Sequence, residues 1–391
     1  MKKIILKKGK EASVLRFHPW IFSGAIYSKP EDIEDGDPVE VYSAGDQYLA
    51  SGHYQNGSIM VRICTFEKTN LKQNFWTRKI QKAFQVRQLL NLAQSGTNCY
   101  RLIHGEGDGL PGLIIDIYDK TAVVQCHSIG MYYEREKIAQ ALQLVFGEAL
   151  NAIYDKSTTS LPPAFAATIQ NDYLLGNGED SVVMEYNHQF SVNWITGQKT
   201  GFFLDQRENR NLLAHYATGK KVLNAFCYSG GFSIYALKAG AQLVHSVDVS
   251  QKAMDLTDQN IQINAPYEGT HQSFTSDVMT FLKESETEYD LMIVDPPAFA
   301  KSISKRHNAV QGYKRLNSLA LQKIGKNSLL FTFSCSQVVD EKLFYNTIVA
   351  AAIEANRKVS VLHRLTQPAD HPVSLFHPEG SYLKGLVLYV E

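Results

Sequence analysis

Residues 221–233 read KVLNAFCYSGGFS and combine a short apolar strand, a turn with two glycines and the first residues of a helix. Val222 and Leu223 supply the apolar side chains of a buried strand. Gly230 and Gly231 leave the turn without bulky side chains, so the backbone can approach a ligand before the helix begins. A strand, a glycine turn and a helix in this order predict a nucleotide-like ligand at the end of the strand.

The chain beyond residue 192 alternates between apolar strands and amphipathic helices. Strands are predicted at KVLNAF, LVHSVDVS, YDLMIVDPP, NSLLFTFSCS, KVSVLHRL and LKGLVLYVE. Helices are predicted around FSIYALKAG, QKAMDLTDQNIQIN, QGYKRLNSLALQKIG and DEKLFYNTIVAAAIEAN. This alternation predicts an α/β fold whose mostly parallel sheet is covered by helices on both faces. The last two strands have no helix between them, so we expect them to pair antiparallel at an edge.

Two smaller regions precede this sheet. From residue 4 to 65, five short strands separated by turn signals predict a small barrel. Residues 71–93 carry apolar side chains at helical spacing and predict a connecting amphipathic helix. Residues 100–189 predict a small α+β unit, in which the run HGEGDGLPG is read as a hairpin turn and not as a phosphate loop. The predicted domains are residues 1–70, 71–190 and 191–391.

Composition narrows the class of protein. The 391 residues hold 39 Lys and Arg against 39 Asp and Glu, so the net charge indicates no polyanionic partner. Bases are nevertheless clustered, with six in residues 68–87 and five in residues 296–315 and no acid in either run. Such runs are typical of phosphate contacts and equally of ordinary solvated faces. The five cysteines form no CxxC pair, and no apolar run approaches ~18 residues, so we expect a cytoplasmic protein without a disulfide framework.

Acidic residues follow three further strands of the predicted sheet. Asp248 lies seventeen residues after Gly231, where a carboxylate can accept from both hydroxyls of a ribose. Asp277 is placed to accept from an adenine amino group. Asp295 precedes two prolines, which stiffen the turn and remove backbone donors. The motif GxGxxG is absent, so the residues up to this point suit NAD, FAD or S-adenosylmethionine.

The set NAFCYSGGFS, VDVS, SDV, VDPPAF and SCS resembles class I S-adenosylmethionine-dependent methyltransferases, and closely the RlmI-like family that methylates cytosine C5 of large-subunit ribosomal RNA. The resemblance covers the whole chain, through HPWIFSGAI, EGDGLPGLIID, TGQKTGFFLDQRENR, PADHPV and PEGSYLKG. It implies an N-terminal PUA β-barrel that binds RNA, a small central α+β domain and a seven-stranded Rossmann-like methyltransferase domain. It also implies S-adenosylmethionine as cofactor, ribosomal RNA as partner and the homodimers that related members often form.

Cofactor contacts follow from this resemblance and from the strand ends. The segment TGQKTGFFLDQRENR would cover the cofactor as a lid, with Phe203 against the donor and Arg207 forking onto a carboxylate. The predicted cofactor-binding residues are Lys199, Thr200, Gly201, Phe203, Asp205, Gln206, Arg207, Asn224, Phe226, Cys227, Tyr228, Gly230, Asp248, Asp277, Asp295 and Pro296.

Cys335 and Asp295 are the predicted catalytic residues. Cytosine C5 is a poor nucleophile, so its methylation needs covalent addition at C6, which a thiolate performs best. Cys335 lies in SCS at the end of a strand that should neighbour the strand before Asp295, and Asp295 would bind the N3/N4 edge of the base. Ala298 stands where many RNA cytosine-C5 enzymes carry a second cysteine. Asp295 or a water molecule is therefore left as the base that removes the C5 proton.

Three other functions remain open at this stage. An amino-group methyltransferase would stack an aromatic ring on the base, and Phe299 comes one residue late for that motif. A non-catalytic RNA-binding or assembly factor, and a nicotinamide oxidoreductase, are the other two. Predicted substrate contacts, whichever methylation applies, are Pro297, Phe299, Lys301, Lys305, Arg306 and Tyr313, with the basic segment gripping RNA phosphates. The spacing of His363, His371 and His377 fits no usual zinc pattern, so no metal is predicted.

Overall fold

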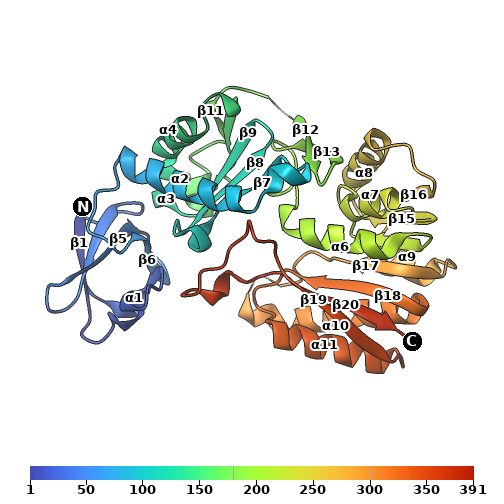
Figure 1. Ribbon diagram of the computed structural model, residues 1–391. Coiled ribbons are helices and arrows are strands. Elements are labelled where there is room, and N and C mark those ends of the chain that lie inside the picture. Colours follow the sequence, from blue (N-terminus) through green and yellow to red (C-terminus); the bar gives the residue numbers. More distant parts are fainter. Residues whose placement is uncertain (179, 301) are drawn as a thin grey trace. The chain divides into compact units, whose positions relative to one another are not determined.

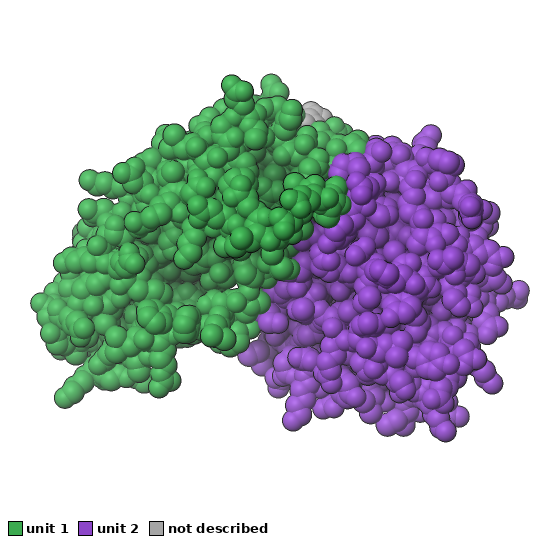
Figure 2. All heavy atoms as spheres, viewed as in Figure 1, with its two compact units in different colours: residues 1–183, 192–204, 369–380 green, residues 184–191, 205–368, 381–391 purple. Residues whose placement is uncertain are grey.

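A computed structural model describes residues 1–178, 180–300 and 302–391. Its contacts divide the chain into two compact units, which Figure 2 colours separately. Unit 1 comprises residues 1–183, 192–204 and 369–380, and unit 2 comprises residues 184–191, 205–368 and 381–391. The chain therefore passes between the units several times, whereas the sequence analysis expected domains in sequence order. Among the described residues, no helix has the length and apolar character needed to cross a bilayer.

Unit 1 begins with a six-stranded sheet in the order β2-β6-β5-β4-β1-β3. Figure 1 labels β1, β5 and β6 of this sheet. Its strands are β1 (Lys2–Leu6), β2 (Trp20–Phe22), β3 (Ile26–Ser28), β4 (Pro38–Tyr42), β5 (Tyr48–Tyr54) and β6 (Ile59–Thr65), with helix α1 (Ala12–Leu15) after β1. The prediction of five strands is wrong by one, because the 3-10 turn η1 (Ser23–Ala25) breaks WIFSGAIY into two strands. Alternate residues such as Ile4, Leu6, Val39 and Val41 form the core of this sheet.

A second sheet of unit 1 has the order β11-β10-β9-β8-β7. Its elements are β7 (Cys99–His104), β8 (Leu113–Tyr118), β9 (Thr121–Cys126), α3 (Ile129–Tyr133), α4 (Arg135–Phe146), β10 (Ala152–Asp155), α5 (Pro163–Ala166) and β11 (Asp172–Leu175). The predicted connecting helix is α2 (Gln73–Leu89), and its buried Trp76 and Ile80 join one core with Leu142 of α4. The glycine-rich run joins antiparallel β7 and β8 through the 3-10 turn η3 (Gly105–Asp108), which confirms the hairpin.

Unit 2 is built on a seven-stranded sheet in the order β16-β15-β14-β17-β18-β20-β19. Its strands are β14 (Lys221–Ala225), β15 (Leu243–Asp248), β16 (Thr270–Thr275), β17 (Tyr289–Val294), β18 (Ile324–Ser334), β19 (Val359–Leu365) and β20 (Lys384–Val390). The neighbours β16, β15, β14, β17 and β18 pair in parallel, and β20 pairs antiparallel with both β18 and β19. The predicted antiparallel pair is thus confirmed, with β19 outermost. The hairpin of β12 (Asp180–Glu185) and β13 (His188–Asn193) precedes this sheet.

Helices cover both faces of the seven-stranded sheet. They are α6 (Arg207–Ala217), α7 (Gly231–Lys238), α8 (Gln251–Ile263), α9 (Val278–Glu284), α10 (Arg306–Lys323) and α11 (Glu341–Glu354). Val222 of β14 packs in the core with α6 and α7, and its neighbour Leu223 packs in the core with α9, α10 and α11. Burial on both faces explains why these strands are continuously apolar. After β14 the strands β15 and β16 are added on one side of it, and β17 is then added on its other side. The carboxyl ends of β14 and β17 therefore border the crevice where such sheets bind ligands.

Candidate active site at the strand ends

The turn after β14 has unusual backbone geometry. Phe226, Tyr228 and Gly230 have φ angles of 60°, 47° and 74°. The left-handed region is unfavourable for the two aromatic residues, and such strain is concentrated at functional turns. At Gly230 a Cβ atom would lie 2.8 Å from Cγ2 of Thr257, so only glycine fits there. The predicted ligand turn is therefore a fixed and strained structure.

Asp248, the last residue of β15, stabilises this turn. Its Oδ2 accepts from the backbone N–H of Tyr228 at 3.2 Å, and its Oδ1 accepts from the backbone N–H of Ser250 at 3.0 Å. Each carboxylate oxygen still has a further lone pair. The carboxylate is thus oriented by the backbone and can accept additional hydroxyl groups.

Other predicted cofactor residues use their side chains within the protein. Asn224 Nδ2 donates to Oγ of Ser233 at 2.9 Å, and Cys227 packs against Met254, with 3.6 Å between the two sulfurs. Burial raises the pKa of the Cys227 thiol to about 12. Asp277 is the N-cap of α9, where its Oδ1 accepts from the backbone N–H of Thr280 at 2.9 Å. These side chains hold the strand ends in shape.

The predicted lid is divided between the units. Residues 199–204 belong to unit 1, where Thr200 is buried and its Oγ1 donates to Oδ2 of Asp116 at 2.6 Å. Lys199 and Gly201 have positive φ angles of 53° and 134° and form the expected turn, and Phe203 follows it. Asp205, Gln206 and Arg207 belong to unit 2.

Asp295 follows directly after β17 and accepts a hydrogen bond on Oδ2 from Nε2 of Gln206 at 2.9 Å. Asn209 fixes that amide, because its Nδ2 donates to Oε1 of Gln206 at 2.6 Å. Desolvation raises the pKa of Asp295 to about 7, and the negative charge of Asp205 adds to the rise. The carboxyl group of Asp295 therefore exchanges a proton near neutral pH. The turn continues into buried Pro296 and exposed Pro297.

Asp205 lies close enough to influence both predicted catalytic residues. Its Oδ2 accepts from the hydroxyl of Tyr382 at 2.6 Å. Its Oδ1 is buried and has no hydrogen-bond partner in the described part of the chain. A buried carboxylate oxygen without a partner is costly, so a bound group that donates a hydrogen bond to this atom would stabilise it.

Cys335 follows β18, which pairs in parallel with β17. Residues 294 and 332 are partners in this register, so the sulfur and the carboxylate of Asp295 come from the same edge of the sheet. Desolvation raises the pKa of the Cys335 thiol to about 11, with Asp295 and Asp205 contributing, while Lys384 opposes the rise. Of the five cysteines, Cys335 alone is partly exposed and the other four are buried.

Lys384 is a site residue that the sequence analysis missed. In the antiparallel pair of β18 and β20, Lys384 lies opposite Ser334, and Ser334 directly precedes Cys335. Nζ of Lys384 donates to the carbonyl oxygen of Ser336 at 2.7 Å, and desolvation lowers its pKa to about 8. The signal was present, because a strand that pairs antiparallel with the strand ending in SCS must bring the lysine of YLKG to that end.

The residues predicted to contact the substrate differ in their exposure. Phe299 is 36% exposed and packs against Tyr313, with ring centroids 4.6 Å apart. Tyr313 is fully buried, so the prediction that it contacts RNA is wrong; it supports Phe299 from behind. Lys305 and Arg306 are exposed at the start of α10. Lys301 lies outside the described residues.

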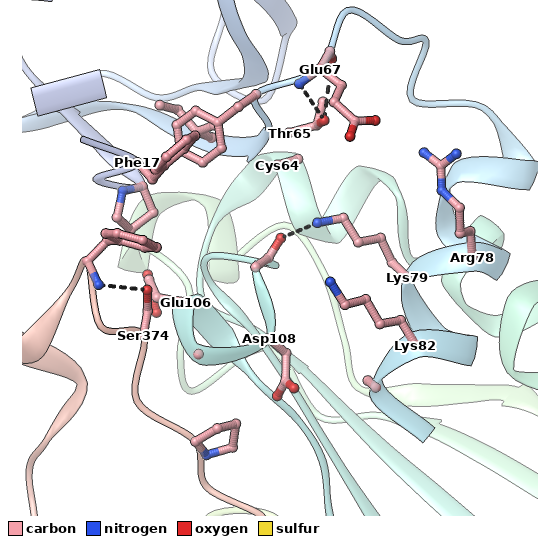
Figure 3. A pocket seen from close by; sticks show the side chains of 18 of the residues that line it. Phe17, Cys64, Thr65, Glu67, Arg78, Lys79, Lys82, Glu106, Asp108 and Ser374 are labelled. Carbon is pink, nitrogen blue, oxygen red and sulfur yellow. Dashed lines mark hydrogen bonds between the residues drawn. The ribbon is translucent and has the colours of Figure 1, made fainter. Parts of the chain in front are cut away.

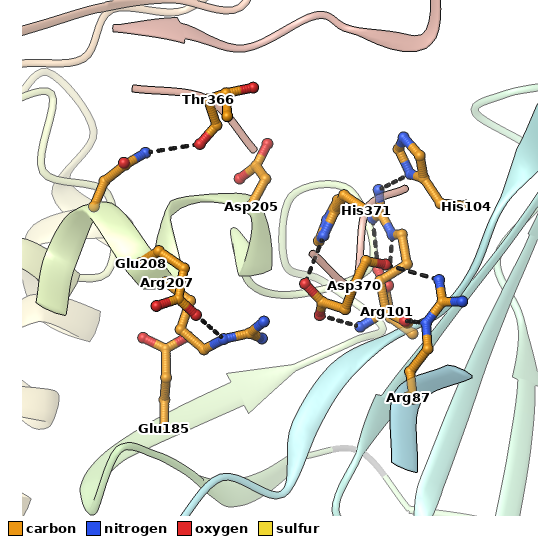
Figure 4. A network of polar contacts seen from close by, with 12 residues as sticks. Arg87, Arg101, His104, Glu185, Asp205, Arg207, Glu208, Thr366, Asp370 and His371 are labelled. Atoms are coloured by element: carbon orange, nitrogen blue, oxygen red, sulfur yellow. Dashed lines mark hydrogen bonds and ion pairs between the residues drawn. The ribbon is translucent and has the colours of Figure 1, made fainter. Parts of the chain in front are cut away.

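Two ion pairs hold the start of α6, and Figure 4 shows the pair of Arg207 and Glu208. Arg210 donates through Nε and Nη2 to both oxygens of Glu185, at 2.8 Å each. Arg207 is also buried, and its Nε donates to Oε1 of the neighbouring Glu208 at 3.2 Å. Arg207, which was expected to bind a carboxylate through two nitrogens, thus uses one of them to bind the carboxylate of Glu208.

Residues 369–373 of the PADHPV loop belong to unit 1, and Figure 4 shows Asp370 and His371 of this loop. Oδ2 of Asp370 accepts from the backbone N–H of Arg101 at 3.0 Å, and its carbonyl oxygen accepts from Nη2 of Arg87 at 2.8 Å. One group of possible metal ligands in the described residues also lies in this unit. His18, His377 and Glu379 bring ligand atoms within 4.8 Å of one another.

Comparisons with known proteins agree with this geometry. Residues 4–66 match the family model of a PUA-like domain, and residues 163–374 match that of an S-adenosylmethionine-dependent methyltransferase. The chain is 39% identical to ribosomal RNA large subunit methyltransferase I of Aeromonas hydrophila, over 98% of each chain. It is 40% identical to the protein of that name from Pseudoalteromonas atlantica, over 99% of each chain.

A solved structure shows the same fold. A putative SAM-dependent methyltransferase from Streptococcus mutans matches 100% of both chains with a TM-score of 0.84 and 24% identity. The predicted fold class is therefore confirmed, with a PUA-like sheet, a central domain and a seven-stranded methyltransferase sheet, and so is the predicted cofactor. This chain belongs to the S-adenosylmethionine-dependent methyltransferases, in the family of ribosomal RNA large subunit methyltransferase I.

Proposed function

We propose that this protein methylates large-subunit ribosomal RNA at C5 of a cytosine, through a covalent adduct between Cys335 and C6 of the base. The observation that carries the proposal is the grouping of a partly exposed thiol, a carboxyl group with a pKa of about 7 and a buried lysine at adjacent strand ends. Thiol addition is what activates C5, and a lone structural cysteine needs neither charged neighbour. The names of the relatives support ribosomal RNA as the substrate.

The residues of unit 2 fit the methyl donor. The turn at residues 226–230 and the oriented carboxylate of Asp248 suit an adenosyl group. The contact of Asp277 with the adenine amino group remains a prediction. The unpartnered Oδ1 of Asp205 suits the ammonium group at the amino-acid end of the donor. When bound, the donor supplies an electrophilic methyl group. Contacts from Lys199, Thr200, Gly201 and Phe203 of unit 1 remain predictions.

Asp295 and Cys335 share one proton in the reactive state. Above pH 7 the resting pair carries this proton on sulfur, since the pKa of the thiol is about 11 and that of Asp295 is about 7. Transfer of the proton to Asp295 creates the thiolate that attacks C6 and the acid that protonates N3 of cytosine. The C5–C6 π electrons move toward N3 as the S–C6 bond forms, which leaves C5 as an enamine carbon.

Release reverses this proton transfer. After C5 has been methylated, a base removes the C5 proton, the S–C6 bond breaks and the thiolate leaves. N3 returns its proton to Asp295, so the catalytic pair is regenerated. Lys384 stabilises the thiolate electrostatically in both steps, because its positive charge favours the ionised sulfur.

The test is to identify the methylated nucleoside. Large-subunit ribosomal RNA from cells lacking the protein is incubated with the purified chain and the methyl donor, digested, and analysed by mass spectrometry. The proposal predicts 5-methylcytidine with the wild-type chain and none with Cys335→Ala. A methyl group on an exocyclic or ring nitrogen would instead favour the amino-group mechanism, in which Phe299 stacks on the base. RNA left unmethylated would favour a non-catalytic RNA-binding factor.

A further inference from the structure

A groove in unit 1 has a volume of about 950 Å³, and its lining includes neither Asp295 nor Cys335, which belong to unit 2 (Figure 3). One side is α2, which presents Arg78, Lys79 and Lys82. The rest of the lining includes Phe17, residues 63–67, the turn η3 with Gly109, and the chain around residues 372–376. A volume near the upper end of the usual range for ligand pockets leaves room for more than one nucleotide unit.

Three positive charges face this groove without an acid on their own helix. Lys79 Nζ donates to the carbonyl oxygen of Gly109 at 3.0 Å. Desolvation lowers the pKa of Lys79, and the charges of Lys82 and Arg78 lower it further, so the three bases repel one another. Arg78 and Lys82 are exposed and form no ion pair with any described residue. An anion in the groove would relieve this repulsion.

The acids of the groove neutralise these bases only in part. Both oxygens of Asp108 accept from Arg87, at 2.5 and 2.8 Å, and Oε1 of Glu106 accepts from Nε1 of Trp20 at 2.8 Å. Glu67 is the remaining carboxylate of the lining. Because Asp108 is paired with Arg87, the three bases of α2 face the two carboxylates Glu106 and Glu67, which leaves an excess of one positive charge.

Exposed aromatic rings form the opposite side of the groove. Phe17 and Phe376 are each 50% exposed, and their ring centroids lie 5.3 Å apart. Phe17 rests edge-on against Phe66, with centroids 5.2 Å apart, and its own backbone has a φ of 62°. The left-handed backbone of Phe17 is strained, and burial of its half-exposed ring offsets little of that strain. Such strain is typical of residues that bind a ligand.

We propose that this groove binds a single-stranded segment of the substrate RNA, with phosphates at Arg78 and Lys82 and a base against Phe17 and Phe376. Free cations beside exposed aromatic rings are the combination that binds single strands, because each nucleotide offers one phosphate and one flat base. The inference rests on the proposed function for the identity of the RNA. It places a contact with that RNA outside the methyltransferase sheet.

The test measures binding without turnover. Fluorescence anisotropy gives the affinity of the full chain for a labelled single-stranded RNA of twelve nucleotides at several salt concentrations. We expect Arg78→Gln with Lys82→Gln to weaken binding about tenfold or more and to lower the salt slope by roughly 0.7 for each phosphate contact removed. We expect Phe17→Gly with Phe376→Ala to weaken binding roughly tenfold with an unchanged salt slope.

Controls separate this site from general charge and from misfolding. Lys252→Gln with Lys326→Gln removes two exposed charges from unit 2 and should leave RNA affinity within about twofold. Each variant must keep the S-adenosylhomocysteine affinity of the wild type by calorimetry, which shows that unit 2 is folded, and the wild-type melting transition of the whole chain.

Two results would overturn the inference. One is RNA affinity that the groove variants leave unchanged. The other is groove-dependent binding of a poly-glutamate peptide as tight as that of RNA, which would indicate an acidic protein partner. Failure of the proposed function looks different: RNA binding would still depend on the groove while no 5-methylcytidine forms.

Discussion

The ends of β14 and β18 both carry a cysteine, and the charges of acidic residues act on both thiols, but only Cys335 also has a lysine among its charged neighbours. Cys227, after β14, is buried between Met254 and Thr257. Cys335, after β18, is partly exposed and lies within the electrostatic influence of Asp295 and Lys384. A position at the carboxyl end of a strand is therefore not sufficient for chemistry. The exposure of the sulfur and the lysine that β20 brings to it distinguish Cys335 from Cys227.

Exchanging each cysteine for alanine gives the largest expected contrast. Cys335→Ala should lower kcat by at least ~10³-fold, because no other described group lies placed to form the adduct. Cys227→Ala should keep kcat within a few-fold and lose roughly 1 kcal/mol of stability through the space it leaves. Initial rates of methyl transfer and chemical denaturation measure the two effects. Equal loss of activity in both variants would contradict the claim that Cys335, and not Cys227, is catalytic.

Asp295→Asn should lower kcat by roughly 10²- to 10⁴-fold, since general acid–base transfer is lost. It should also change the pH profile. In the wild type, kcat/KM should rise as pH increases through about 7 and then level off, because one proton remains on the pair between about 7 and 11. In the variant this rise near pH 7 should disappear. A profile that keeps it would assign the ionisation to another group.

Lys384→Met tests the charge beside the thiol while nearly preserving side-chain volume. Without the lysine the pKa of the Cys335 thiol should rise, because Lys384 opposes the effects of burial and of Asp295. Alkylation of Cys335 by iodoacetamide at pH 8 should slow roughly three- to tenfold, as followed by peptide mass spectrometry. Lys326→Met, on an exposed residue, serves as the control. An unchanged alkylation rate would show that Lys384 does not affect the pKa of the Cys335 thiol.

The burial of the ionised Asp295 carboxylate should also lower the free energy of unfolding. The pKa of Asp295 is raised from 3.8 to about 7, so the folded chain binds more protons than the unfolded chain between these values, and stability falls as pH rises from about 4 to 7. Asp295→Asn should therefore stabilise the fold at pH 8 by on the order of 2 kcal/mol, less than the full shift because the side chain keeps some exposure. At pH 4 the difference should nearly vanish. Denaturant titrations at the two pH values measure it.

The sequence was sufficient for the parts of the fold that follow local rules. Continuous apolar runs between amphipathic helices predicted the doubly covered sheet, and the missing helix before the last strand predicted its antiparallel pairing. The division of the chain could not be predicted, because residues 192–204 and 369–380 join unit 1 through contacts with residues far away in sequence. The extra strand in the first sheet depends on a 3-10 turn without a strong sequence signal.

The candidate site shows the same limit. Asp295 and Cys335 follow recognisable strands, so their proximity could be inferred. Lys384 required the register of β20 against β18, and the fully buried position of Tyr313 depends on how α10 packs. Residue type predicts what a side chain can do, and tertiary packing decides whether it faces a ligand.

Trapping on 5-fluorocytosine RNA tests the central claim most directly. Fluorine at C5 cannot leave as a proton does, so the adduct should persist and appear in mass spectra as RNA bound to the peptide that contains Cys335. The adduct should form with the wild-type chain and with Cys227→Ala and should be missing with Cys335→Ala. Methylation of ordinary RNA without a trapped adduct, or an adduct on any other residue, would contradict the assignment of Cys335.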